Sequence, residues 1–295
     1  MHVLWVIHAL SVLSCAKNSK MRIFAKRYHD QVALITGACG GLGSALATVL
    51  AKSGCHLALV DINEEKLATF AQEIARYPVN VSTHTCNIGD LEAVTLLESE
   101  IKTHHGKLDL LINNAGITLQ RSAANHSHAD WQRVFGVNWW GTVNCCSTFL
   151  PLLKNSPNAQ IVNLSSMAAY YGLPSQASYS SSKAAVLAYS EALRAELSVD
   201  NIGVITVHPG AIKTEMMTAT LQESDNMEQA RKNYALATRW GVEANVVAEK
   251  ILRAVCKRRN ELKVGPDAYI LYYFSLLMPN FLGKLLATSF KKSMK

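Results

Sequence analysis

Short apolar segments recur along the chain from residue 32 onward, each followed by a stretch with helical periodicity, and this alternation constrains the fold more than any other feature. The segments lie at residues 32–36, 57–61, 79–86, 108–113, 161–165 and 204–208, with a last short one at 263–264. Most are apolar throughout, as expected for strands of a parallel sheet that helices cover on both faces. The sequence therefore predicts an α/β fold with a single doubly wound Rossmann-type domain.

We expect three parts along the chain. Residues 1–30 form an N-terminal extension, residues 31–266 form the Rossmann-type domain, and residues 267–295 form an apolar and basic C-terminal tail. Residues 215–240 are polar and prone to form helix, and they follow the last central strand. Ligands of doubly wound folds lie outside the carboxyl ends of the strands, so this insertion is a candidate lid.

The charged and sulfur-containing residues exclude several classes of function. The net charge is +7, but the basic residues are spread thinly except for Lys284, Lys291, Lys292 and Lys295. No basic stripe with interleaved aromatic residues occurs, which argues against nucleic-acid binding. The seven cysteines have irregular spacing and form no C-x-x-C pair, and no H-E-x-x-H motif occurs. We therefore expect a reducing, cytoplasmic location and no metal site.

Two apolar segments near the ends of the chain leave alternatives open. Residues 3–13 are too few to span a membrane and are not preceded by Lys or Arg, so we expect a frayed extension, with export as the minor alternative. Residues 268–278 read AYILYYFSLLM, and Pro279, Gly283 and Lys284 interrupt the apolar stretch that follows. This tail is either a core or dimer-facing helix, or an amphipathic element that contacts a membrane peripherally or lines an apolar substrate entrance.

A glycine-rich turn follows the first apolar segment and opens the first predicted helix. Its sequence is TGACGGLG, from Thr36 to Gly43. Glycine lets the main chain turn tightly and approach a pyrophosphate, while the helix start supplies free N–H groups and a positive dipole end. We expect a dinucleotide to bind this turn at Gly37, Cys39, Gly41, Leu42 and Gly43.

Asp61 ends the second predicted strand, eighteen residues after Gly43. A carboxylate there can accept hydrogen bonds from the ribose hydroxyls of NAD and would repel the extra phosphate of NADP. No Lys or Arg stands beside it, so the sequence favours NAD without excluding NADP. Asn114, Ala115 and Gly116 end the fourth strand, where small residues and amides suit a wall against an adenosine.

Tyr179 and Lys183 are four residues apart at the start of an amphipathic helix, so both lie on one face. A tyrosine titrates near pH 10, and a neighbouring ammonium or nicotinamide cation would lower its pKa toward neutrality. Tyr179 could then exchange a proton with a carbonyl or alcohol oxygen. Ser165 and Ser166 end the preceding strand, where a hydroxyl can meet Tyr179.

Taken together, these motifs resemble the classical short-chain dehydrogenase/reductase family over residues 31 to about 265. The resemblance includes TGACGGLG, NNAG, VNWWG, IVNLSS, YSSSK and HPGAIKT in this order. It implies an NAD(P)-dependent oxidoreductase acting on CH–OH groups and a homo-oligomer. It also implies that Tyr179 is the acid/base, that Lys183 binds the nicotinamide ribose, and that Ser166 holds the substrate oxygen.

The same resemblance implies further roles and shows one departure. Asn138 would hold a water in a proton relay to Lys183, and the nicotinamide carboxamide would be framed by Pro209, Gly210, Ile212 and Thr214. Asn87 stands before Ile88 where the family has an aspartate that contacts the adenine. An amide can still hydrogen-bond there, but it carries no charge.

Three segments, at residues 138–141, 208–214 and 264–268, together with the apolar tail that follows the last one, are similar to a branch of the family with lipophilic, often membrane-associated members. By analogy the substrate would be a steroid, a retinoid or a long-chain acyl carbonyl. The alternative is a non-catalytic dinucleotide-binding or membrane-surface scaffold protein on the same fold. That alternative predicts loss of Ser166, Tyr179 or Lys183, and all three are present.

Overall fold

A seven-stranded sheet forms the centre of the computed structural model, which describes residues 22–214 and 224–293. The strand order is β3-β2-β1-β4-β5-β6-β9, and every neighbouring pair is parallel. The strands are β1 (Val32–Thr36), β2 (His56–Asp61), β3 (Val81–Thr85), β4 (Leu110–Asn113), β5 (Gln160–Leu164), β6 (Gly203–Pro209) and β9 (Glu261–Val264). The predicted doubly wound fold is confirmed.

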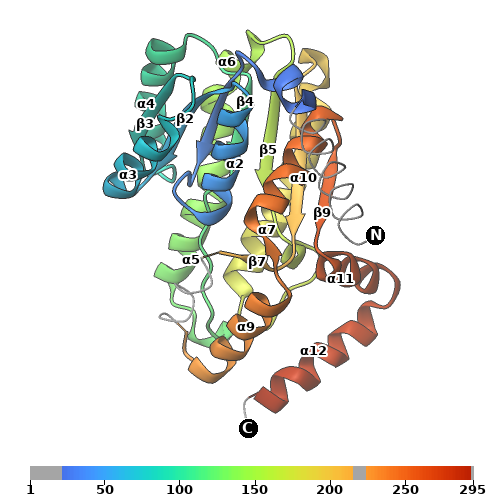
Figure 1. The fold of residues 1–295 in the computed structure, drawn as a ribbon. Helices are drawn as coiled ribbons and strands as arrows, with labels where there is room; N and C mark the ends of the chain where they lie inside the picture. Colours follow the sequence, from blue (N-terminus) through green and yellow to red (C-terminus); the bar gives the residue numbers. More distant parts are fainter. Residues whose placement is uncertain (1–21, 215–223, 294–295) are drawn as a thin grey trace, which may run out of the picture.

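Helices cover both faces of the sheet (Figure 1), and two apolar clusters fill the space between the helices and the strands. One cluster joins the sheet to α2 (Gly41–Lys52), α3 (Glu64–Ile74) and α10 (Ala244–Cys256). The other joins it to α4 (Leu91–His105), α6 (Gly141–Lys154) and α7 (Ala177–Glu196). Strand order reverses between β1 and β4, so the segments that leave these two strands diverge and open the site where such folds bind ligands.

The edge strand β3 departs from the expected all-apolar pattern. Its sequence is VSTHT, and Ser82 and His84 are buried while Thr83 and Thr85 are exposed. His84 and Ser82 hydrogen-bond to each other at 2.7 Å, and His84 also meets Glu100 of α4 at 2.7 Å. Helices cover only part of an edge strand, so polar residues are accommodated there.

The residues before β1 pack onto the domain. Phe24 and Tyr28 are almost completely buried, and the Tyr28 hydroxyl donates a hydrogen bond of 2.7 Å to the carbonyl oxygen of Leu252 in α10. The packed body of the protein therefore begins before residue 31, where the sequence places the end of the extension. Residues 1–21, including the apolar segment 3–13, lie outside the described residues.

The insertion after β6 is closed at its base. The short strand β7 (Ile212–Lys213) pairs with β8 (Val242–Glu243), and α9 (Met227–Trp240) lies between them in the sequence. Asp225 ties the insertion to the segment after β4, because its carboxylate accepts hydrogen bonds from Ser122 N at 3.0 Å and Asn125 Nδ2 at 2.8 Å. Residues 215–223 of the expected lid lie outside the described part of the chain.

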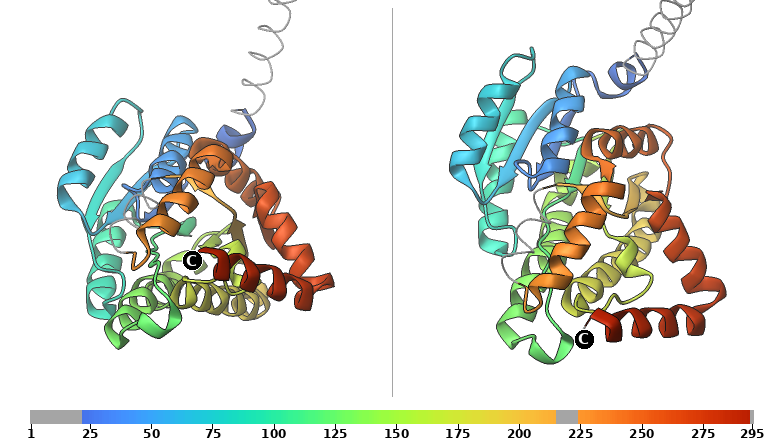
Figure 2. Two further views of the ribbon diagram at one scale, coloured as in Figure 1. Left: turned by 90° about the horizontal axis from the view of Figure 1, so that it is seen from below. Right: turned by 60° about the horizontal axis from the view of Figure 1, so that its bottom comes forward.

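The C-terminal tail folds into two helices, α11 (Pro266–Leu277) and α12 (Pro279–Ser293), which turn a corner at Met278 and form an arm at one edge of the molecule (Figure 2). Among the residues that the structure describes, no helix is both long enough and apolar enough to cross a bilayer. The carboxyl ends of the strands point toward the side that carries this arm and α9 (Figure 1).

Candidate active site

The turn between β1 and α2 packs so closely on itself and on the segment after β4 that Gly37 and Gly43 have no room for a side chain. Gly37 has a φ of +63°, and a Cβ there would lie 2.8 Å from the Cα of Ala115. At Gly43 a Cβ would lie 2.1 Å from the Gly37 carbonyl oxygen. Gly40 caps α2 without a side-chain hydrogen bond, and the first turn of α2 carries no acidic residue. The helix start therefore fits an anion such as the pyrophosphate of a dinucleotide.

Gly41, Leu42 and Cys39 of the turn differ in which of their atoms could contact a cofactor. Gly41 lies against Thr214, whose Cγ2 would be 3.0 Å from a Cβ at position 41. Leu42 is buried in the core, so only its main chain can contribute to a cofactor site. Cys39 is half-buried, and burial together with the nearby Asp61 carboxylate raises the pKa of its thiol to about 12.

Asp61 is placed at the turn, as expected for a ribose-binding residue. Its Oδ2 accepts a hydrogen bond of 3.0 Å from Cys39 N, and its Oδ1 accepts one of 3.1 Å from Asn63 N. Each carboxylate oxygen has further lone pairs for ribose hydroxyls. Asn63 accepts a hydrogen bond from Lys66 N and caps α3, so Asp61 is not required as the cap.

Asn114 and Thr36 hold the glycine turn together. Asn114 Nδ2 donates to the carbonyl oxygens of Thr36 and Gly37, each at 3.0 Å. Thr36 Oγ1 accepts hydrogen bonds of 3.1 Å from the main-chain N–H groups of Asn114 and Ala115. The side-chain amide of Asn114 thus donates its hydrogen bonds to the turn itself. This is a structural role in addition to the adenosine wall expected from the sequence. Thr36 opens the glycine motif, and this position is its only signal in the sequence.

Asn87 and Ile88 occupy the loop after β3, near the carboxyl end of β2. The Asn87 side chain is exposed, and its Oδ1 accepts a hydrogen bond of 3.1 Å from Gly89 N. Ile88 is buried against Gly141, where a Cβ would lie 2.5 Å from Ile88 Cδ1. Asn144 Nδ2 donates a hydrogen bond of 3.0 Å to the Ile88 carbonyl oxygen. This leaves the Asn87 amide nitrogen available to an adenine.

Residues 209–214 form the opposite side of the site and are held by the C-terminal arm. Gly210 N donates to the Val264 carbonyl oxygen at 2.8 Å, and Ala211 N donates to Asp267 Oδ2 at 2.7 Å. A Cβ at Gly210 would lie 2.0 Å from Asp267 Oδ1. Pro209 ends β6, and Ile212 packs against the core. Asp267, for which the sequence carries no signal, therefore fixes this loop from the first turn of α11.

Tyr179 and Lys183 lie on α7, as the spacing predicts. Lys183 is buried, and its Nζ donates a hydrogen bond of 2.7 Å to the carbonyl oxygen of Leu164 at the end of β5. The same Nζ lies 5.9 Å from the centre of the Tyr179 ring. The Ser166 side chain lies close enough to the Tyr179 hydroxyl to lower its pKa. The predicted grouping of Ser166, Tyr179 and Lys183 is therefore present.

Burial changes the pKa values of Tyr179 and Lys183 in opposite directions. Burial raises the pKa of Tyr179, and the Ser166 side chain offsets only part of that increase. Burial also lowers the pKa of Lys183 to about 8. The protein's own residues thus do not bring the pKa of Tyr179 down toward neutrality, because the ammonium is itself desolvated and is bonded to a main-chain carbonyl.

Asn138 lies in a π-helical turn, η2 (Gly136–Trp140), and is completely buried. Its Oδ1 accepts a hydrogen bond of 2.8 Å from Ile117 N, and its Nδ2 donates to Ile117 O at 2.9 Å and Ser182 Oγ at 3.0 Å. Ser182 Oγ donates in turn to the Tyr179 carbonyl oxygen at 2.7 Å. A Cβ on Gly116 would lie 3.2 Å from Asn138 Oδ1 and 3.3 Å from Lys183 Nζ. The two side chains therefore flank Gly116.

A polar network lies behind Ser166. His208 is buried, and its Nδ1 is 3.2 Å from the Ser166 carbonyl oxygen. Its ring lies 4.6 Å from the ring of Tyr170, whose hydroxyl donates to the carboxylate of Glu261. Burial lowers the pKa of His208 to about 4, so the imidazole is neutral at physiological pH. The network fixes the main chain on either side of Ser166.

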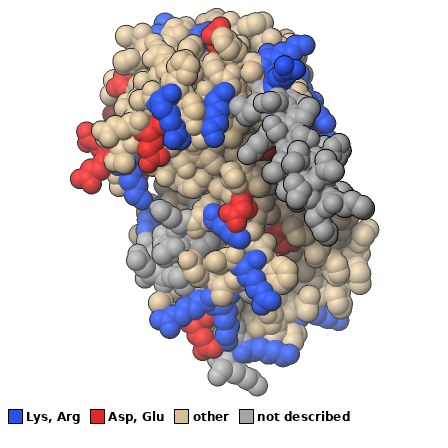
Figure 3. All heavy atoms as spheres, viewed as in Figure 1, with Lys and Arg blue, Asp and Glu red and all other residues tan. Residues whose placement is uncertain are grey.

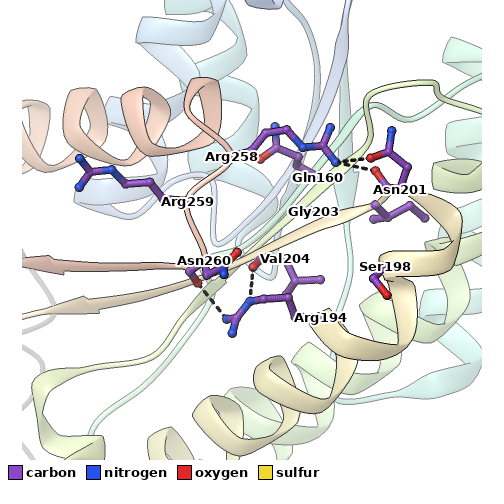
Figure 4. Close-up of a pocket in the computed structure, with 10 residues that line it drawn as sticks. Gln160, Arg194, Ser198, Asn201, Gly203, Val204, Arg258, Arg259 and Asn260 are labelled. Atoms are coloured by element: carbon purple, nitrogen blue, oxygen red, sulfur yellow. Dashed lines mark hydrogen bonds between the residues drawn. The ribbon is translucent and has the colours of Figure 1, made fainter.

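A separate cavity of about 220 Å³ lies at the amino ends of β5 and β6, away from these residues (Figure 4). Arg194 Nε donates to the Val204 carbonyl oxygen at 2.8 Å, and Arg258 Nη2 donates to the Asn201 carbonyl oxygen at 2.6 Å. Both guanidinium groups therefore bond to main-chain carbonyls. Ligands of doubly wound folds lie at the opposite, carboxyl ends of the strands.

The fold and the residues at its carboxyl edge define the class of dinucleotide-binding oxidoreductases. The chain belongs to the short-chain dehydrogenase family, whose model matches residues 31–225. Within this family, the chain is 32% identical over 262 residues to the probable oxidoreductase EphD of Mycobacterium tuberculosis. That match covers 85% of this chain but only 44% of EphD, so the chain spans less than half the length of that relative.

Two further proteins resemble the chain over most of their length. Dehydrogenase/reductase SDR family member 7B of Xenopus tropicalis is 32% identical over 275 residues, which are 90% of this chain and 88% of that protein. The crystal structure of a short-chain dehydrogenase/reductase from Burkholderia phymatum, in complex with NAD, superposes with a TM-score of 0.77. It is 27% identical and the match covers 84% of this chain and 93% of that one.

Proposed function

We propose that this protein transfers a hydride between NAD(P) and an alcohol or ketone, with Tyr179 as the acid/base. The observation that carries the proposal is that Lys183, on the next turn of α7, has its Nζ 5.9 Å from the centre of the Tyr179 ring and bonded to the end of β5, which Ser166 follows. This group stands at the carboxyl edge of the sheet, on the side of the glycine turn. A dinucleotide and a substrate oxygen can therefore meet there.

Each residue has a distinct role in this proposal. Ser166 holds the substrate oxygen beside the Tyr179 hydroxyl, and Tyr179 takes the proton of an alcohol or returns it to a ketone. Lys183 binds the nicotinamide ribose, and Asn138 supports Lys183 across Gly116. When bound, the nicotinamide accepts or gives the hydride, and its positive charge favours the phenolate that the buried site alone disfavours.

The preferred cofactor in this proposal is NAD. The support is the contact of Asp61 with the turn, where its carboxylate accepts a hydrogen bond from Cys39 N. A phosphate on the ribose would meet this negative charge, whereas hydroxyl groups can donate to it. Cys39 and Ile62 offer no compensating positive charge.

The proposed substrate is lipophilic, of the steroid, retinoid or acyl-chain type. Support comes from the arm next to the site. Tyr170 and Tyr171, which follow Ser166 after the short helix η3 (Met167–Ala169), contact the apolar helices α11 and α12. Assembly into a homo-oligomer through other surfaces belongs to the same proposal.

The experiment that tests this function is steady-state turnover with a series of secondary alcohols of rising chain length, with NAD and NADP in turn. We expect NADH formation, with kcat/KM rising with chain length because a longer chain buries more apolar surface. A protein that binds NADH but turns over no member of the series, in either direction, would instead be the non-catalytic dinucleotide-binding alternative.

A further inference from the structure

We propose that the outer face of α11 and α12 is a docking surface for a bilayer that contains anionic lipids. The proposal rests on the proposed function only for the identity of the substrate, because the surface itself is defined by exposure and charge. The partner of the arm is then a lipid, and exposed residues of α11 and α12 make the contact.

The first observation is the exposure of large apolar side chains. Leu276 is 63% exposed and Leu277 is 72% exposed. The other members of this surface, which we call the apolar face, are Tyr269, Ile270, Tyr273, Phe274, Met278, Phe281 and Leu285. On α11 these side chains fall on one side of the helix, and no charged residue interrupts the run from Ala268 to Met278. Contiguous exposed apolar patches of this kind mark interaction surfaces.

The second observation is the charge of the arm. Residues 268–295 contain no Asp or Glu but four lysines, Lys284, Lys291, Lys292 and Lys295. Lys284, Lys291 and Lys292 are exposed on α12. Figure 3 shows the corner over α12, at the lower right, with basic side chains amid uncharged ones. A basic and apolar surface is complementary to the anionic headgroups and acyl chains of a bilayer interface.

The third observation is that the inner side of the arm is already fixed to the body. Leu282 and Ala268 are buried, and Gly283 lies against Tyr171, whose hydroxyl would be 2.6 Å from a Cβ there. The rings of Tyr272 and Tyr170 lie 4.8 Å apart. The apolar face is therefore presented outward by two helices whose opposite side is packed.

A bilayer suits this surface better than a second copy of the chain. A symmetric pairing of two arms would bring the lysines of α12 close to their own copies, and like charges across an interface oppose association. The helices are 12 and 15 residues long, too short to span a bilayer but sufficient to lie in its interface. Tyr269 and Tyr273 have the apolar ring and polar hydroxyl that favour that depth.

The apolar face lies on the arm that packs against the residues after Ser166, and this position suggests a role in substrate delivery. Tyr170 and Tyr171 contact α11 and α12 and lie four and five residues after Ser166. A protein docked through the apolar face would hold the residues after Ser166 one helix layer away from the lipid. A lipophilic alcohol or ketone could then pass from the bilayer to Tyr179 with little exposure to water.

Vesicle co-sedimentation tests the proposal with the full chain. We expect binding to phosphatidylcholine vesicles that contain phosphatidylglycerol, and at least tenfold weaker binding to phosphatidylcholine alone. Replacing Leu276→Glu and Leu277→Glu together should reduce binding at least tenfold, whereas Val199→Glu, at a site that is 87% exposed on another part of the surface, should not. Lys291→Glu with Lys292→Glu should reduce binding to the anionic vesicles at least about 25-fold, at about 5-fold or more per lysine.

The matched control for the charge reversal is Lys52→Glu with Lys102→Glu, at two exposed lysines on α2 and α4. Equal loss of binding in this control, or no binding of the native chain to anionic vesicles, overturns the proposal. So does a native dimer in lipid-free buffer that Leu276→Glu and Leu277→Glu convert to monomer, because a second copy would then cover the face. Tyr179→Phe should bind vesicles like the native chain, so failure of the catalytic assignment leaves this result unaffected.

Discussion

Asp267, in the first turn of α11, accepts a hydrogen bond of 2.7 Å from the main-chain nitrogen of Ala211. Its other carboxylate oxygen accepts one of 3.0 Å from Ala268 N. The same carboxylate fills the space beside Gly210 and Gly265, where a Cβ would lie 2.0 Å and 2.4 Å from Asp267 Oδ1. The loop proposed to frame the nicotinamide is therefore anchored to the C-terminal arm rather than to the sheet alone.

Asp267→Ala should weaken the binding of NADH, because Ala211 N loses its acceptor and the loop loses its anchor. We expect an increase in Kd of about tenfold, the equivalent of one lost hydrogen bond to a charged group. Asp267→Asn retains an oxygen acceptor and should raise Kd less, about threefold or below. Fluorescence titration with NADH gives both values, and an unchanged Kd in Asp267→Ala would show that the loop is held by other contacts.

Asp61→Asn should shift the cofactor preference toward NADP. The substitution keeps an oxygen that can accept from Cys39 N but removes the charge that opposes a ribose phosphate. We expect the ratio of kcat/KM for NADP over NAD to rise about tenfold or more. Glu64→Gln removes the same charge from the exposed start of α3 and serves as the control. Equal shifts in both variants would mean that Asp61 has no specific role.

Thr36→Val should destabilise the protein. The hydroxyl of Thr36 accepts hydrogen bonds from Asn114 N and Ala115 N, and valine leaves both N–H groups without that acceptor. The free energy of unfolding should fall by roughly 2–4 kcal/mol, as two half-buried donors lose their partner. Thr36→Ser keeps the hydroxyl, so its free energy of unfolding should fall by only about 1 kcal/mol or less. Denaturant unfolding of the two variants checks the difference, and equal losses would contradict the role of the hydroxyl.

Lys183 should make the stability depend on pH in the alkaline range. Burial lowers the pKa of Lys183 to about 8, whereas a lysine of an unfolded chain titrates at about 10.4. Between these values the unfolded chain binds a proton at this residue that the folded chain does not, so the free energy of unfolding rises with pH across the window. That contribution is complete above the unfolded pKa and is lost as the pH falls through about 8.

The measurement is the difference in unfolding free energy between the native protein and Lys183→Met, taken at several pH values. The difference should move in favour of the native protein by roughly 3 kcal/mol from pH 8 to about pH 10.4. Other titrating groups are common to both proteins and cancel. A difference that does not change with pH would show that the ammonium remains charged in its buried position.

The sequence was sufficient to predict the parallel sheet, because buried strands of such a sheet are apolar on both faces and each is followed by a helix. It was less informative at the edge, where β3 buries Ser82 and His84 among polar partners. The packing of Tyr28 before β1 has no signal in the sequence, because its hydroxyl bonds to Leu252 in α10, more than 200 residues away.

In the candidate site, too, residues that follow a local pattern could be predicted, whereas residues with distant partners could not. Tyr179, Lys183 and Asp61 were found because spacing on one helix or position at a strand end brings them to the carboxyl edge. Asp267 and Ser182 were missed because their partners, Ala211 and Asn138, are distant in the sequence. The burial that raises the pKa of Tyr179 could not be predicted, since spacing does not reveal that Lys183 is buried and bonded to Leu164.

The central claim is that Tyr179 exchanges the proton while a nicotinamide exchanges the hydride. Tyr179→Phe removes the hydroxyl and keeps the ring, so the fold and the binding of NADH should be preserved. We predict that kcat with the best alcohol of the series falls at least 1,000-fold, the order expected when an acid/base group is removed, while the Kd for NADH changes less than about threefold. Turnover of Tyr179→Phe at the native rate would contradict the account.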